Sequence, residues 1–256
     1  MKTRSILLIF IVLPLLYSCR SSRSMLKEIH PLKSSLYYEL TSPLYEGMRE
    51  HTVYMDFISY SNIDYYTSVK RKKVTIIPLL FFNYEGELFN LRLGEHSLTQ
   101  LYREFLTEAL LTECNSSTCF KLQDNQKGTI LPDSAYRLEI KIRKNETTAK
   151  VKLNNSSFLW FQGEMVDVAN NTLRPAMSNL EISVRLSRQH ECLLDKTYST
   201  EWKQNRRKQS YGDSPSANAA CLDDMTESLS MATKEIVEEI SREMHLILSL
   251  QPKYRR

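Results

Sequence analysis

Two stretches of this chain alternate apolar and polar residues in a way that only an extended backbone can use. The first is AYRLEIKIR at 135–143, and the second is LEISVRLS at 180–187. Successive side chains of a strand point to opposite faces, so each stretch presents one apolar face and one polar face. A sheet with one face buried and the other toward water or a partner is typical of antiparallel pairing. The alternation therefore predicts a mainly antiparallel β-sheet.

A continuous apolar run at 74–82, VTIIPLLFF, predicts a further strand. Runs without alternation are typical of central strands that are buried on both faces. Pro78 lies within the run and has no N–H to donate to a neighbouring strand, which favours a bulge or an edge position instead. Turns are predicted at Asn83–Gly86 and at Asn145–Glu146, with a later one near Gln189.

Apolar residues recur every three or four positions in two other stretches, which predicts two amphipathic helices. The first is predicted over 97–114, because Ser97 and Gln100 fit a capping box. The second is predicted over about 223–249, with Asp223 as its N-cap.

The stretch before the last helix, residues 204–220, is polar and rich in small side chains, which predicts a long loop. The fold class that follows is α+β, a mainly antiparallel β-sheet with two amphipathic helices packed on one face. We expect residues 36–256 to form it as a single domain, because their length suits one domain.

The first residues of the chain have the features of an export signal. Lys2 and Arg4 precede an apolar run from Ile6 to Leu16. That run is too short to cross a bilayer as a helix, which needs about 20 residues. Leu16-Tyr17-Ser18-Cys19 then resembles the bacterial lipobox, in which an obligatory cysteine follows a small residue.

This resemblance implies that residues 1–18 are a lipoprotein signal peptide and that Cys19 becomes the lipidated N-terminus. Acyl chains such as palmitate would then anchor the protein, and residues 19–35 would be a flexible tether. Arg20 stands where an aspartate would resemble an inner-membrane retention signal. The resemblance therefore implies the outer membrane of the cell envelope, with the domain facing the periplasm. The alternative is an ordinary signal peptide with an incidental cysteine.

The charge balance gives no support for nucleic-acid binding. Lys2 and Arg4 are the only charged residues before Cys19, so their removal lowers the formal net charge from +4 to +2. A nucleic-acid-binding domain normally carries a strongly basic surface. The expected partners are therefore the membrane, through the lipid on Cys19, and a protein of the cell envelope.

Four cysteines follow Cys19, and an oxidising compartment would allow them to pair. Three connectivities exist for four cysteines. The local choice is Cys114–Cys119 together with Cys192–Cys221. Metal binding is the rival interpretation, since His190-Glu191-Cys192 brings two potential ligands together. No CxxC or HxxxH spacing supports it, so the sequence predicts no metal site.

Catalytic signatures are missing from the sequence. The histidines are scattered, and no HExxH, GxSxG, GxGxxG or P-loop pattern occurs. Carboxylates on strands are usually solvated and would need burial to act as acid and base. We therefore expect a non-enzymatic protein without a cofactor.

The order of these elements resembles that of small bacterial lipoproteins that assist larger envelope machines. These are the lipopolysaccharide-assembly lipoprotein and the auxiliary lipoproteins of ABC-type and intermembrane lipid transporters. The stretches that carry the resemblance are Val74–Phe82, Ser97–Cys114, Tyr136–Arg143, Leu180–Lys203 and Asp223–Leu248. The resemblance implies two helices against one face of a four- or five-stranded sheet. It lies in element order rather than in a residue motif.

The first functional hypothesis is an accessory or structural subunit of a transport or assembly complex. Its contact surfaces would be the polar sheet face and the loop at 204–220. The second is a module that binds a lipid or other amphiphile in a groove between helices and sheet, lined by Tyr102, Phe105, Trp160 and Met244. An envelope hydrolase is a third hypothesis, and it would need a cleft of convergent polar residues.

Overall fold

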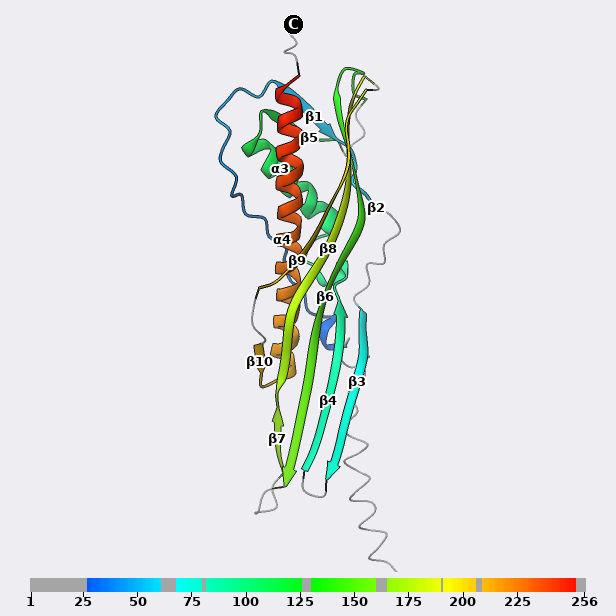
Figure 1. Cartoon of the computed structure of the whole chain (residues 1–256), viewed down its shortest axis with the longest axis vertical. Helices are drawn as coiled ribbons and strands as arrows, with labels where there is room; N and C mark the ends of the chain where they lie inside the picture. Colours follow the sequence, from blue (N-terminus) through cyan, green and yellow to red (C-terminus); the bar gives the residue numbers. More distant parts are fainter. Residues whose placement is uncertain are drawn as a thin grey trace, which may run out of the picture.

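The computed structural model describes residues 27–60, 68–79, 82–125, 130–159, 165–189, 191–205 and 209–251 (Figure 1). Its elements are β1 (His51–Met55), β2 (Ser59–Tyr60), β3 (Ser68–Leu79), β4 (Phe82–Arg92), the 3₁₀ turn η1 (Glu95–Ser97), α3 (Tyr102–Ser117), β5 (Phe120–Asp124), β6 (Tyr136–Leu159), β7 (Met165–Ala169), β8 (Asn171–Arg188), β9 (Glu191–Lys203), β10 (Gln209–Tyr211) and α4 (Ser214–Ser249).

The described strands form one mixed sheet built around β6. Along one side β6 pairs with β8 and, at its end, with β7. Along the other side it pairs with β1, β2 and β4 in succession. β9 lies outside β8, and β3 lies outside β4. The pairs that join β1 to β5 and β6, and β2 to β6, are parallel, whereas the long strands pair antiparallel.

The predicted fold class, α+β, is confirmed. Figure 1 shows an elongated molecule in which α3 and α4 lie beside the twisted sheet. α4 contacts β6, β8 and β9, and α3 contacts β5 and α4. α4 has 36 residues and is therefore about 54 Å long at 1.5 Å per residue.

The alternating strands provide the core, as the sequence predicts. One face of β6 and β8 is buried beneath the helices, through Leu138, Ile140, Ile142, Leu180, Ile182, Val184 and Leu186. The predicted stripe of α4 is buried as well, with Leu229, Ile236, Ile240 and Met244 all at most 2% exposed. We call the polar face on the other side of the sheet the outer face.

The apolar run at 74–82 does not form a central strand. β3 pairs only with β4 among the described strands, so it lies at an edge of the sheet. An edge strand needs no hydrogen-bond donor on its open side, which is why Pro78 is tolerated there. Of the two placements predicted for this run, the edge position is confirmed.

Two predicted turns are wrong, and one is confirmed. Asn83–Gly86 belongs to β4, and Asn145–Glu146 lies inside the 24-residue strand β6. β6 stays continuous there because it keeps pairing with β8. The pairing continues on both sides of two register shifts, at Ile142/Lys144 and at Thr148/Lys150. The chain does turn at Gln189, which has a φ of 48°.

Both helix starts differ from their predictions. Ser97 lies in η1, and α3 begins only at Tyr102 without a side-chain cap. α4 begins at Ser214, where the Asp213 carboxylate accepts a hydrogen bond from the Ser216 N–H at 2.7 Å. The loop predicted at 204–220 is therefore wrong over most of its described length, because residues 209–211 form β10 and residues 214–220 form the first turns of α4.

The end of the predicted tether packs on the domain. Ile29 is 2% exposed in the core, and the Ser34 hydroxyl donates a hydrogen bond to the Asp223 carboxylate at 2.9 Å. The folded part therefore begins before residue 36. Cys19, with the other residues of 1–26, lies outside the described residues.

Candidate interaction site

An open groove of about 400 Å³ lies on the outer face of the sheet. Its floor consists of polar residues from three neighbouring strands. Glu139 of β6 is paired with Arg185 of β8, which is paired in turn with Asp195 of β9. The row therefore alternates in charge across the sheet, an arrangement that stabilises cross-strand neighbours.

The next row of the floor is held by hydrogen bonds. Lys141 of β6 is paired with Ser183 of β8, which is paired with Thr197 of β9. The Ser183 and Thr197 hydroxyls lie 2.8 Å apart, and Arg143 Nε donates a hydrogen bond to Ser183 Oγ at 2.7 Å. Arg143 is thereby fixed along the floor of the groove.

The rim comes from the segment between β1 and β2. The Asp56 N–H donates a hydrogen bond to the Leu138 carbonyl at 2.9 Å, and Ser59 Oγ lies 3.5 Å from the Ile140 carbonyl. Between these contacts the Phe57 side chain is 53% exposed, with the Arg103 guanidinium 4.8 Å from its ring centroid. Aromatic and arginine side chains are enriched in surfaces that bind another protein.

The chemistry of the groove suits recognition. Its lining provides carboxylates, cations, hydroxyls and one aromatic ring, and it includes no histidine or cysteine. No group of three or more potential metal ligands occurs in the described part of the chain. Such a lining can form ion pairs and hydrogen bonds with a ligand that carries both charges.

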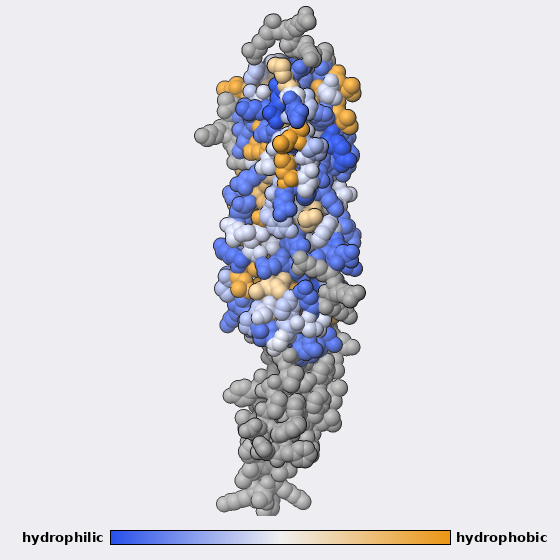
Figure 2. Space-filling view, turned by 90° about the vertical axis from the view of Figure 1, so that its left-hand side faces the viewer, coloured by the Kyte–Doolittle hydropathy of each residue, from blue (hydrophilic) through white to orange (hydrophobic). Residues whose placement is uncertain are grey.

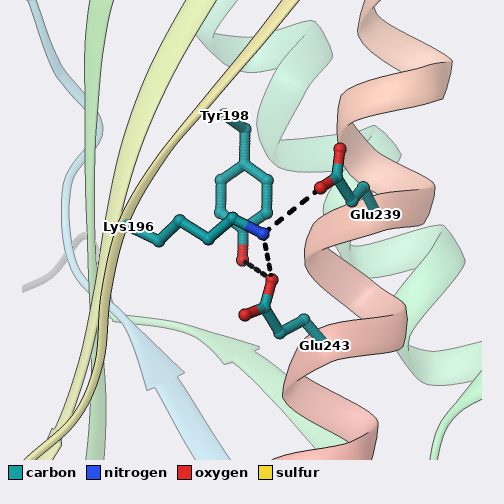
Figure 3. Close-up of polar contacts among 4 residues, drawn as sticks. All are labelled: Lys196, Tyr198, Glu239 and Glu243. Carbon is teal, nitrogen blue, oxygen red and sulfur yellow. Dashed lines mark hydrogen bonds and ion pairs between the residues drawn. The ribbon is translucent and has the colours of Figure 1, made fainter.

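A polar cluster fixes β9, the outer strand of the groove, to α4 (Figure 3). Lys196 Nζ lies 2.7 Å from Glu243 Oε2 and 3.3 Å from Glu239 Oε1. The Tyr198 hydroxyl donates a hydrogen bond to the same Glu243 oxygen at 2.8 Å, and Lys196 Nζ lies 4.5 Å from the Tyr198 ring centroid. Asp195 and Thr197 alternate with Lys196 and Tyr198 along β9, and Asp195 lines the groove, so the cluster holds the strand that presents this carboxylate.

The same cluster shifts the protonation of its members. The hydrogen bond from Lys196 lowers the pKa of Glu243, and the hydrogen bond to Glu243 raises the pKa of Lys196. Burial, followed by the hydrogen bond to Glu243, raises the pKa of Tyr198. The three groups therefore persist in the cluster as a carboxylate, an ammonium and a neutral phenol at neutral pH.

We expect the contribution of Glu243 to the stability of the fold to depend on pH. Because its pKa is lower in the folded state than the ordinary 4.5, its contribution is complete above that value and is lost as the pH falls through the folded-state pKa. Glu243→Gln should lower the thermal midpoint at pH 7, and the difference from the wild type should shrink near pH 3. Thermal denaturation monitored by circular dichroism measures both.

Glu235→Gln is a matched control for this prediction. Glu235 lies on the same helix and accepts a hydrogen bond from the neutral Thr200 hydroxyl at 2.6 Å. Its substitution should change the midpoint less. An equal midpoint loss for Glu243→Gln at both pH values would contradict the role given to the carboxylate.

The residues predicted to line a groove between helices and sheet lie in the core instead. Tyr102 and Met244 are fully buried and Phe105 is 3% exposed, while Trp160 lies outside the described residues. The Tyr102 hydroxyl is 3.0 Å from Thr233 Oγ1 of α4. A small cavity between α4 and the sheet, beside Leu91, has a volume of about 10 Å³. That volume holds about one water molecule, far too little for an acyl chain.

Neither predicted disulfide is present, because the four cysteines of the folded domain are free thiols. Cys114 is buried on α3, and burial raises the pKa of its thiol to about 12. The Cys119 N–H donates a hydrogen bond to His245 Nδ1 of α4 at 3.0 Å. Cys192 is exposed on β9, whereas Cys221 is buried within α4. None of the four thiols is therefore bonded to the partner that the sequence predicted for it.

The sequence did not single out the residues of the groove. The alternation at 135–143 and 180–187 marks the polar positions of β6 and β8, but it does not say which of them are paired. Phe57 belongs to a tyrosine-rich stretch at 36–66, for which the sequence favours sheet packing over a binding surface. The burial of its neighbour Ile58, which leaves Phe57 at the surface, becomes visible only in the structure.

Comparisons with known proteins find a likeness in shape. No family model and no curated protein matches the sequence. A solved structure, protein XCC0632 from Xanthomonas campestris, described with the family model DUF330, is similar with a TM-score of 0.46 and 12% sequence identity. The alignment covers 84% of this chain and 95% of that one. None of the described helices is both long and apolar enough to cross a membrane.

Proposed function

We propose that this chain is a lipid-anchored, non-enzymatic accessory subunit of a cell-envelope complex for transport or assembly. The observation that carries the proposal is the sequence Leu16-Tyr17-Ser18-Cys19, which follows a short export signal. Two or more acyl chains on Cys19 would give stable anchoring where a single chain does not. In this proposal the lipid belongs to the outer membrane and the domain faces the periplasm.

The groove on the outer face is the docking site in this proposal. It offers alternating charges and an exposed Phe57, which suit a protein segment better than an acyl chain. A tether to the membrane raises the effective concentration of the domain toward a partner in the same membrane. An accessory subunit of this kind needs a fixed binding surface, which the cluster between β9 and α4 supports.

Charge reversal in the groove tests the docking site. Lys141→Glu combined with Arg185→Glu reverses two of the three cations that line the groove, so a partner cross-linked in intact cells should be recovered about tenfold less. The control is Lys121→Glu combined with Arg242→Glu, which places the same charge change on exposed residues of β5 and α4. Quantitative mass spectrometry of the cross-linked species measures the recovery. Equal recovery of the same partner with both double variants would remove the groove from the proposal.

A further inference from the structure

A row of basic residues lies on the outer face where β6 pairs with β4 and β8, and Figure 1 shows β4 in the lower half of the sheet. Paired positions join four adjacent strands in this row. Lys70 of β3 is opposite Asn90 of β4, Asn90 is opposite Lys150 of β6, and Lys150 is opposite Arg174 of β8. Lys150 and Arg174 are both exposed. Like charges directly opposite each other destabilise a sheet, so this pair has a cost that a bound anion would relieve.

The rows on either side are basic as well. One contains the exposed Lys152, and the other contains the exposed Lys203. No aspartate or glutamate occupies a paired position in these three rows. We call them the basic rows. The row that follows toward the groove holds Glu146 and Glu201, which marks the boundary of the basic surface.

The chain enters the folded domain at the level of the basic rows. Ile29 lines the small cavity together with Leu91, Arg92 and Asn218, and the Asn218 amide donates a hydrogen bond to the Glu28 carboxylate at 2.9 Å. Ile29 lies ten positions after Cys19, and a stretch of this length can span at most about 35 Å. A lipid on Cys19 would therefore keep this part of the sheet close to the membrane.

The groove lies away from this region along the same strand. Lys141 and Lys150 are nine residues apart on β6, which corresponds to about 30 Å. Figure 2 views the molecule from the side of the helices, where hydrophilic residues predominate among those described, and part of α4 carries net negative charge. On the turns of α4 from 234 to 243 four glutamates outnumber three cations, which are Lys234, Arg242 and the Lys196 of β9 that is bonded to Glu239 and Glu243. A negatively charged surface would therefore attract the basic rows and repel the helices.

We propose that the basic rows bind the anionic phospholipid headgroups of the membrane that holds the anchor, and so orient the domain with its groove free for a protein partner. This inference rests on the proposed lipid anchor at Cys19. Lysine and arginine side chains gain attraction to an anionic leaflet only within about one Debye length, so the contact requires the proximity that the tether provides. Arg20, Arg23 and Lys27 add positive charge between the lipid and the domain.

Lysine footprinting on vesicles tests this inference with the native, lipidated chain. The protein is reconstituted into vesicles of phosphatidylcholine alone, or with about one third phosphatidylglycerol, and treated with a membrane-impermeant amine reagent. Modification of Lys150 and Lys152 should be about fivefold slower on the anionic vesicles, and about 1 M salt should abolish the difference. Lys121, exposed on β5, is the internal control and should react equally on both.

Each other outcome has a distinct meaning. Equal modification of Lys150 and Lys152 on both vesicle types overturns the inference. Protection of these lysines in native membranes but not on anionic vesicles also overturns the inference. It would indicate that an acidic protein covers the basic rows instead. A chain that carries no lipid and leaves phosphatidylcholine vesicles in the wash contradicts the proposed anchor. Lys150→Glu combined with Arg174→Glu, checked for folding by circular dichroism, should abolish the protection of Lys152.

Discussion

Replacing Cys19 with serine is expected to move the protein from the membrane fraction to the soluble fraction. The lipobox cysteine provides the sulfur to which the lipid is attached, and serine cannot replace it. Each buried CH₂ of an acyl chain contributes about 0.8 kcal/mol, so the loss of two or more chains removes essentially all of the anchoring. Fractionation of cells by ultracentrifugation, followed by immunoblotting, measures the result.

Cys192→Ser provides the matched control for the anchor. Cys192 is also an exposed cysteine, but it lies on β9 within the folded domain. Its substitution should leave the protein in the membrane fraction. A Cys19→Ser protein that still sediments with membranes after a high-salt wash would show that another part of the chain holds it there. Mass spectrometry of the mature N-terminus then shows directly whether Cys19 carries acyl chains.

The sequence predicted the buried faces of the long strands correctly because they obey a local rule. Leu138, Ile140 and Ile142 alternate with charged residues in the sequence, and each of them is at most 2% exposed in the structure. Alternation of this kind depends only on strand geometry and not on which strand is the neighbour.

The start of the last helix was mispredicted for a physical reason that the structure makes clear. Ala217 and Cys221 are fully buried, so the small residues that resembled a loop allow α4 to pack closely against the sheet. Asp213 followed by Pro215 was the available signal, because aspartate is a favoured N-cap and proline is tolerated in the first turn.

The groove could not be predicted from residue spacing. Its floor depends on Glu139, Arg185 and Asp195 meeting in one row, and these residues come from three strands that are distant in sequence. Register between such strands is set by the packing of their buried faces and by bulges such as the one at Ile142/Lys144. A one-residue change in that register would place apolar residues on the outer face instead.

Met244→Ala is expected to cause a large loss of stability, and this result would decide between core and ligand groove. Met244 is fully buried in the core beneath α4. Truncation of a buried methionine costs about 2–5 kcal/mol, because transfer free energy is lost and a cavity is left behind. In a domain of this size each kcal/mol lowers the thermal midpoint by about 2–4 °C.

Leu246→Ala is the control variant for the stability loss expected from Met244→Ala. Leu246 lies two residues further along the same helix and is 57% exposed, so its truncation should change the free energy of unfolding by less than about 0.5 kcal/mol. A clear difference between the two variants supports a filled core beneath α4. If Met244→Ala unfolds at the wild-type temperature, its side chain must line open space, and an amphiphile-binding groove between helix and sheet would again become the better explanation of function.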